Sequence, residues 1–273
     1  MAPKPLRTLS LWIAVGALTG ASLAAQTPAP PPIDPALPER LKELKDMASD
    51  REMKQDFQAI GLIQSLTKEP DKLNPKDQSR LAKALGAVFK TGKVRPAGQD
   101  HLYREAANAL AGFGEEGAKE LAKAFENKKH EDNIALRAHL LEAIGKTQDE
   151  DQIELLLDEA TRSPHDDLRA AAGTGLGEFT NAKVKDKREI VEKLIRSWGA
   201  LHAQATRLQN NDPNAPIDFG PQNARRTLDK VESRWIATLT RLTGQSMTQF
   251  EDWQRWENKN PHWEPPSTQT AKK

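Results

Sequence analysis

A repeated arginine–glycine spacing constrains this chain more than any other feature of its sequence. Three segments each carry an arginine that is followed by a glycine eight residues later. The arginines lie 33 and 32 residues apart, and so do the glycines; the pairs are Arg104 with Gly112, Arg137 with Gly145, and Arg169 with Gly177. A fixed period of this length is typical of helical solenoids, in which a helix pair buries its apolar faces only against neighbouring pairs. The spacing therefore predicts an all-α fold, an alpha–alpha solenoid of stacked helix pairs.

Each repeat is expected to divide into two helices around its glycine. The glycine is predicted to end the first helix in the left-handed conformation, which it adopts without a side-chain clash. Second helices are predicted to follow from Ala118, Asp151 and Lys187. Alanines between arginine and glycine favour close approach of neighbouring first helices; they are Ala106, Ala107, Ala138, Ala170, Ala171 and Ala172. The three arginines are expected to serve packing or loop bonds. Acids ahead of them are predicted to act as helix N-caps, namely Asp100, Asp132, Asp166 and Asp167.

The arginine, the small residues after it, the closing glycine and the leucine-rich second helix resemble HEAT repeats over residues 101–198. The likeness is greatest to the short bacterial class named after phycobilisome lyases. Residues 49–90 look like an earlier, degenerate pair of helices, with Phe57, Ile60, Ile63 and Leu66 in the first helix and Pro75 opening the second. Residues 222–243 are predicted to form a later, longer helix. Members of this family are mainly interaction scaffolds, with a few lyases, so the resemblance implies a non-catalytic protein-binding scaffold.

The first 24 residues have the order of a secretory signal peptide. Lys4 and Arg7 precede an apolar stretch over 9–21, and small residues end at Ala24. A retained anchor is the alternative, although the apolar stretch is shorter than the roughly 20 residues that cross a bilayer. We expect a periplasmic or extracellular protein with a cleaved signal over 1–24, a proline-rich linker over 25–38, a repeat domain over 39–263 and a disordered tail over 264–273.

Composition argues against several chemistries. The chain has no cysteine, which excludes thiolate zinc sites, lipid attachment at a cysteine and thiol catalysis, and its formal charge of +1 gives no general attraction to nucleic acid. His101, His130 and His165 precede the first helices beside acids, but without metal-ligand spacing they are interpreted as loop residues. Gly173 and Gly175 are interpreted as packing glycines, because no Lys-Ser or Lys-Thr follows them. No metal and no cofactor are expected, and the basic residues from Arg225 to Arg234 are interpreted as a solvated helix face.

Two segments carry the candidate binding residues. The proline-containing loop over 210–222 interrupts the repeat and holds Ile217 and Phe219. The final stretch concentrates aromatic rings, among them Trp253 and Trp256, at three-residue spacing after Phe250. Those rings either cap the open end of the solenoid or stack on sugars. The preferred hypothesis is an unidentified protein partner bound on the concave face, with a polysaccharide-binding accessory protein and a structural envelope component as alternatives.

Overall fold

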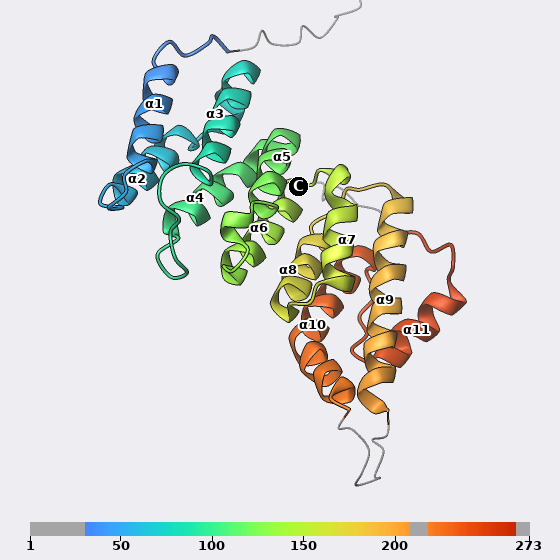
Figure 1. The fold of residues 1–273 in the computed structure, drawn as a ribbon. Coiled ribbons are helices and arrows are strands. Elements are labelled where there is room, and N and C mark those ends of the chain that lie inside the picture. Colours follow the sequence, from blue (N-terminus) through green and yellow to red (C-terminus); the bar gives the residue numbers. More distant parts are fainter. Residues whose placement is uncertain (1–30, 208–217, 266–273) are drawn as a thin grey trace, which may run out of the picture. The chain divides into compact units, whose positions relative to one another are not determined.

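The computed structural model describes residues 31–207 and 218–265, and in these two stretches the chain is helical without a strand (Figure 1). The α-helices are α1 (Leu37–Ala48), α2 (Asp56–Leu66), α3 (Pro75–Val88), α4 (His101–Leu110), α5 (Gly114–Phe125), α6 (Ile134–Lys146), α7 (Ile153–Arg162), α8 (Asp166–Leu176), α9 (Val184–Thr206), α10 (Gly220–Thr243) and α11 (Phe250–Lys259). Short 3₁₀ helices cover Pro70–Lys72, Ala111–Phe113, Lys128–His130 and Glu150–Gln152.

The helices form two rows. In the even row, α2, α4, α6, α8 and α10 each pack on the next member of the row. In the odd row, α1 packs on α3, α3 on α5, α7 on α9, and α9 on α11, whereas α5 and α7 scarcely touch. Successive helices also pack across the rows, most extensively α7 with α8 and α9 with α10. The all-α solenoid predicted from the repeat is confirmed.

The repeat core lies between the two rows. Leu140 and Ile144 of α6 are fully buried, as are Leu156 of α7 and Leu168 of α8. The three repeat arginines make the packing and loop bonds that we expected. The Arg169 guanidinium donates to the carbonyl oxygens of Ala160 (3.2 Å) and Thr161 (3.0 Å) near the end of α7. The Arg137 guanidinium lies over the Phe125 ring, 4.4 Å from its centre. The Arg104 guanidinium donates to the Asp100 carboxylate (3.1 Å).

The prediction that the repeat glycines adopt the left-handed conformation is wrong. Among the described glycines, positive φ occurs only at Gly92, Gly98, Gly114 and Gly244. Gly145 lies inside α6, and Gly177 ends α8 in the right-handed conformation with φ −68°. Close helix packing accounts for Gly145, because a β-carbon there would lie 2.4 Å from the backbone of Gly175 in α8. A β-carbon at Gly177 would lie 2.7 Å from the Thr238 hydroxyl of α10.

The predicted capping role of the acids before the arginines is also wrong. Neither Asp100 nor the residue before Asp166 makes a side-chain cap, and α6 is capped by Asn133, whose side chain accepts from the Leu136 amide (3.0 Å). Asp100 is buried and instead accepts hydrogen bonds from Arg104 (3.1 Å) and from Asn133 of the next repeat (2.9 Å). It therefore joins consecutive repeats.

The earlier pair over 49–90 forms α2 and α3, and Pro75 opens α3 as predicted. Phe57 does not belong to the buried face, because its side chain is 81% exposed while Ile63 is fully buried. Residues spaced by three drift around a helix that turns about 100° per residue, so Phe57 and Leu66 point in opposite directions.

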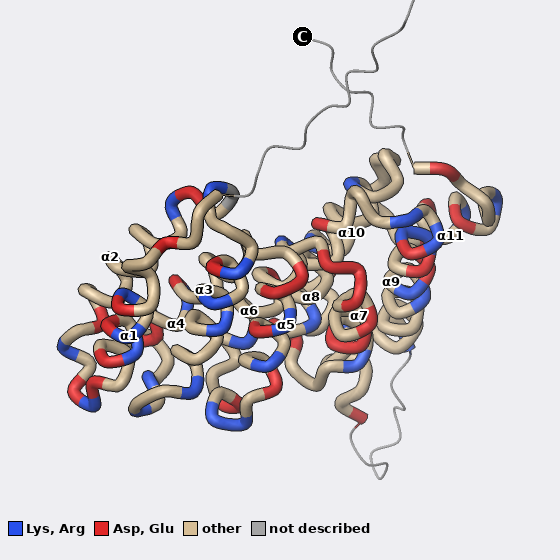
Figure 2. The backbone as a smooth tube through the Cα atoms, turned by 90° about the horizontal axis from the view of Figure 1, so that it is seen from above, with Lys and Arg blue, Asp and Glu red and all other residues tan. Residues whose placement is uncertain are grey.

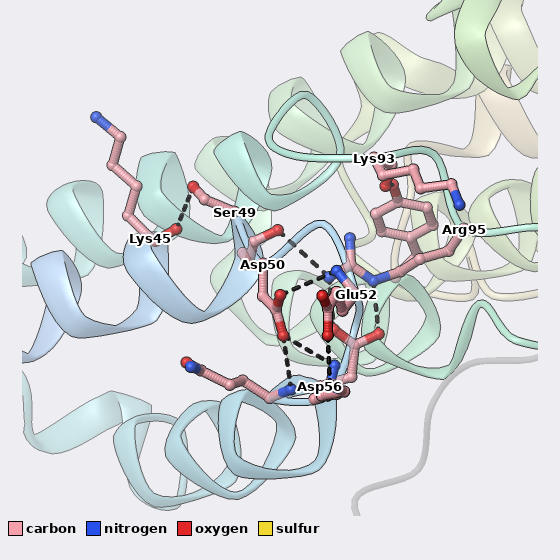
Figure 3. Close-up of polar contacts among 11 residues, drawn as sticks. Lys45, Ser49, Asp50, Glu52, Asp56, Lys93 and Arg95 are labelled. Atoms are coloured by element: carbon pink, nitrogen blue, oxygen red, sulfur yellow. Dashed lines mark hydrogen bonds and ion pairs between the residues drawn. The ribbon is translucent and has the colours of Figure 1, made fainter.

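Arg95 fixes the loop between α3 and α4 onto α2 (Figure 3). Its buried guanidinium binds the Asp56 carboxylate through Nε (2.6 Å) and Nη2 (2.5 Å), and Nη2 also reaches the Ala48 carbonyl (3.3 Å). The same guanidinium lies 5.1 Å from the centre of the Tyr103 ring. Arg95 therefore joins the loop before α4 to α2, to the end of α1 and to Tyr103 of α4.

The predicted signal peptide over 1–24 lies outside the described residues, and so do the first six residues of the predicted linker and most of the predicted tail. Helix α1 starts at Leu37, inside the last two residues of the predicted linker. Of the predicted tail, Glu264 is described and contacts Arg188 (3.4 Å). Across the described stretches, every helix is too short or too polar to cross a membrane.

Candidate interaction surface

The two rows are packed with different spacing. In the even row, glycine allows backbones and rings to meet directly, since a β-carbon at Gly173 would lie 2.3 Å from the Trp235 ring of α10. In the odd row, neighbouring helices leave grooves between them. Cavities of about 580 and 340 Å³ follow α7 along its border with α9, and one of about 720 Å³ lies between α9 and α11. Helix α9 therefore has a groove on each side.

The residues that line the α7/α9 groove are predominantly acidic, and in Figure 2 the tube of α7 carries several red Asp and Glu positions. Its acidic lining residues are Glu150, Asp151, Glu154, Asp158, Asp186 and Glu189. Its bases are already engaged: Lys183 pairs with Glu150 (2.6 Å), Lys193 with Glu189 (2.6 Å) and Arg162 with Asp158 (2.6 Å). The Lys183 ammonium lowers the pKa of the Glu150 carboxyl. Buried Ile153 and Leu157 form an apolar floor.

The α9/α11 groove is lined by two helix faces. Helix α9 contributes Arg188, Glu192, Ile195, Arg196, Gly199, His202 and Ala203 at helical spacing. Helix α11 contributes Phe250, Gln254, Glu257 and Asn258, and the chain then returns along the groove through Asn260, Pro261 and Trp263. In Figures 1 and 2, α9 and α11 lie side by side.

Contacts between the walls bound this groove at both ends. At one end, the Phe250 ring packs against His202 (centroids 5.3 Å) and Trp198 (5.6 Å). Gly199 makes room for this ring, because a β-carbon there would lie 2.8 Å from it. At the other end, the Arg188 guanidinium donates to the carbonyl oxygens of Trp263 (2.9 Å) and His262 (2.8 Å). The groove between them extends about 21 Å along α9.

Charges within the α9/α11 groove are balanced. Glu192 and Arg196 form an ion pair on α9 (2.5 Å). Burial, together with the nearby Glu192 carboxylate, raises the pKa of Glu257. Among the described residues Glu257 has no ion-pair or hydrogen-bond partner, so its carboxyl is available to a ligand.

The residues that the sequence proposed as binding residues differ in their exposure to solvent. Ile217 lies outside the described residues, and Phe219 stands at the start of α10 with 59% of its surface exposed. Trp253 is fully buried, and its indole donates to the Met247 carbonyl (3.0 Å). A ligand has no access to that ring, so Trp253 is not a binding residue.

Trp256 is half-buried between two other rings. Its ring centre lies 6.0 Å from that of Trp253 and 5.7 Å from that of Trp263. Phe250 and Trp253 are both buried against α9 or the segment before α11. The aromatic residues of α11 thus cover α9, which favours the capping interpretation over the sugar-stacking one for Phe250, Trp253 and Trp256.

Four basic residues of α10 have acidic partners in α6, in α8 or just after α8, whereas Arg225 donates to the Ala205 carbonyl oxygen of α9 (3.0 Å). Arg226 pairs with Asp166 (3.0 Å), Lys230 with Asp167 (3.0 Å), Arg234 with Glu142 (3.0 Å) and Arg241 with Glu178 (2.8 Å). These bridges fasten α10 to α8 and α6 and neutralise its basic side. Helix α10 begins at Gly220, two residues before the predicted start at 222, because Pro221 is accommodated in its first turn.

The three histidines that precede the repeats do not form a row of ligands. His101 and His165 are exposed, whereas His130 is buried with Nε2 2.9 Å from the Phe89 carbonyl oxygen. Within the described stretches, no three histidine or acidic side chains gather in a way that could hold a metal ion.

Comparison with known proteins agrees with this geometry. Residues 97–177 match the family model for HEAT repeats. The match spans α4 to α8 and includes all three arginine–glycine pairs. No curated protein and no solved structure matches the chain. The HEAT match supports a helical-repeat scaffold, an architecture that typically mediates protein interaction.

The residues that line the α9/α11 groove were not identified from the sequence, although one pattern in the sequence indicated them. Arg188, Glu192 and Arg196 follow one another at four-residue spacing on a long predicted helix. That pattern also describes an ordinary solvated helix face. Only the packing of α11 against α9 distinguishes the two.

Proposed function

We propose that the protein is an exported, non-catalytic HEAT-repeat scaffold that binds a protein partner along the α7/α9 groove. The acidic lining of this groove over an apolar floor supports the proposal. Asp151, Glu154 and Asp186 line it without an ion-pair partner among the described residues. A partner surface bearing lysine or arginine would complement these charges, and charge complementarity gives an interface its orientation and association rate.

The spacing of the rows supports the same surface. Side chains and backbones in the even row are in direct contact from α6 to α10, so this row offers little room for a partner between its helices. The odd row offers cavities on both sides of α9. The sequence favoured the concave face as the binding surface, and the proposal now specifies the surface made by α7 and α9.

Charge reversal at Glu154 tests the proposal. Glu154 is exposed and lines both α7/α9 cavities, so Glu154→Lys introduces repulsion toward a basic partner without disturbing the core. Glu232→Lys is the matched control, because Glu232 is an exposed glutamate on α10, outside the grooves. The tagged full chain, expressed in its native host, is purified with its bound proteins and the captured set is compared by mass spectrometry.

We expect wild type and Glu232→Lys to capture the same protein and Glu154→Lys to lose it. Raising the salt concentration should weaken the wild-type complex, since exposed charges are screened over about 10 Å at 0.1 M salt. Equal capture by all three chains, or capture of no specific protein by wild type, would reject the α7/α9 surface.

A further inference from the structure

The α9/α11 groove differs in chemistry from the acidic groove on the other side of α9. Its lining holds two arginines, Arg188 and Arg196, and two glutamates, Glu192 and Glu257. Arg188 is occupied by backbone carbonyls, and Arg196 by Glu192. A strongly anionic or cationic ligand therefore finds no excess of opposite charge in this groove.

One face of α11 presents unused hydrogen-bonding groups to the groove. Gln254, Glu257 and Asn258 lie within one turn of each other and line the cavity. None of the three side chains makes a hydrogen bond or an ion pair with another described residue. Amides both donate and accept, and a carboxylate accepts through two oxygens, so this set matches a ligand with several neighbouring hydroxyl groups.

Rings stand at the two ends of the same groove. The stacked pair of His202 and Phe250 bounds one end, and half-buried Trp263 lines the other. A volume of about 720 Å³ is within the range of sites that enclose small ligands. Because wall-to-wall contacts bound both ends, a short ligand fits this space better than a long peptide that must enter and leave it.

From these features we infer that the α9/α11 groove binds a short, uncharged oligosaccharide, held by the amide and carboxyl groups of α11 between the two aromatic ends. Neither Trp253 nor Trp256 lines this cavity, and the Trp256 ring contacts the Trp263 ring with their centres 5.7 Å apart. The inference is independent of the protein-binding proposal, which concerns the opposite side of α9.

Direct titration of the full chain tests the inference. The probes are cellotetraose, chitotetraose, xylotetraose, mannotetraose and maltotetraose, measured by isothermal calorimetry and by tryptophan fluorescence. At least one tetrasaccharide is expected to bind with a dissociation constant of about 1 mM or tighter. A spectral change should accompany binding, because Trp263 lines the groove.

The double variant Gln254→Ala/Asn258→Ala locates the site. Both side chains are exposed, so the variant should fold, and loss of two hydrogen-bonding groups should weaken binding about tenfold or more. Gln222→Ala/Asn223→Ala removes the same two residue types from an exposed part of α10 and should leave binding unchanged.

Three results would overturn the assignment. They are absence of binding for all five tetrasaccharides, binding that survives in the α11 double variant, and tighter binding of an uncharged tetrapeptide that the same double variant abolishes. Circular dichroism of both variants confirms that the helices are intact. The Glu154→Lys chain should bind the tetrasaccharide as wild type does, which separates this site from the protein-binding surface.

Discussion

Single residues set the spacing of the even row, and the repeat glycines show how. The three glycines are equivalent in sequence but differ in surroundings. A β-carbon at Gly145 would lie 2.4 Å from the Gly175 backbone, whereas a β-carbon at Gly112 would have no atom within 4 Å. Sequence periodicity finds such positions without revealing which of them are crowded, because crowding depends on the neighbouring helix.

Gly145→Ala should therefore destabilise the protein and Gly112→Ala should not. The added methyl group at 145 forces α6 and α8 apart, and overpacking of this kind costs about 1–3 kcal/mol. The free energy of unfolding, measured by urea denaturation, should fall in the first variant and stay within about 0.5 kcal/mol in the second. Equal effects would mean that the close approach of α6 and α8 is absent in solution.

We expect two buried or half-buried histidines, His130 and His139, to make the stability of the protein dependent on pH. Burial lowers the pKa of His130, with Lys129 acting in the same direction and the Phe89 carbonyl and Asp100 opposing it. Burial and the nearby Arg104 guanidinium also lower the pKa of His139. Nδ1 of His130 and Nε2 of His139 are buried without a hydrogen-bond partner among the described residues, so a proton there would have no acceptor.

The unfolded chain binds protons at these two histidines at higher pH than the folded chain does. The free energy of unfolding should therefore be largest above the ordinary histidine pKa of about 6.5 and should fall as the pH drops below it. Urea denaturation between about pH 7.5 and pH 5.5 measures this. His130→Gln, which keeps a donor for the Phe89 carbonyl but does not titrate, should reduce the decline; an unchanged decline would show that His130 titrates normally.

At the scale of elements, helix α11 is the test of the capping interpretation. Its Phe250 ring packs against the Trp198 ring of α9, and its Trp253 side chain is fully buried. Truncation after Gly244 should lower the free energy of unfolding by at least about 3 kcal/mol, the cost of removing one large buried aromatic residue. Truncation after Pro265 removes no described contact and is the control.

Tryptophan emission gives a second readout of the same truncation. Trp198 and Trp235 are fully buried in the intact chain, so native emission should be blue-shifted. Loss of α11 should shift the emission to the red as Trp198 meets solvent. A shortened protein with unchanged stability and emission would show that α11 is not the cap.

An element could be predicted from the sequence where the interactions that form it join residues close together in the chain. The pairs α4 to α8 repeat a local pattern, and α3 begins at a proline, so their existence could be read directly. The conformation of Gly145 and the hydrogen bond of Asp100 to the next repeat depend on neighbouring helices, and the predictions for these two residues failed. The α9/α11 groove depends on contacts between residues 74 to 76 positions apart, such as Arg188 with the 262–264 segment, and no local pattern encodes them.

At the scale of the whole chain, export has a direct chemical test. The order of basic, apolar and small residues over 1–24 predicts removal of the signal peptide. The mass of the protein purified from its native host should correspond to a chain that starts at Ala25 or Gln26. A mass that includes Met1 would contradict export by cleavage.

The stacked architecture predicts that stability varies along the molecule. In a solenoid, each helix pair is held by its own hydrogen bonds and its immediate neighbours, so local opening can occur without global unfolding. Helices α6, α8 and α10 have the most extensive packing, whereas α1 and α2 have less, and α5 scarcely contacts α7. Hydrogen–deuterium exchange read by mass spectrometry should find the slowest backbone amides in α6, α8 and α10 and faster exchange over α1 to α3.

Gly145→Ala should accelerate exchange in α6 and α8 with little effect on α1 to α3, because the contact between Gly145 and Gly175 belongs to the α6/α8 interface only. Uniform protection over the whole stack, or an equal effect of the variant on every helix, would instead show that the chain opens as one cooperative unit.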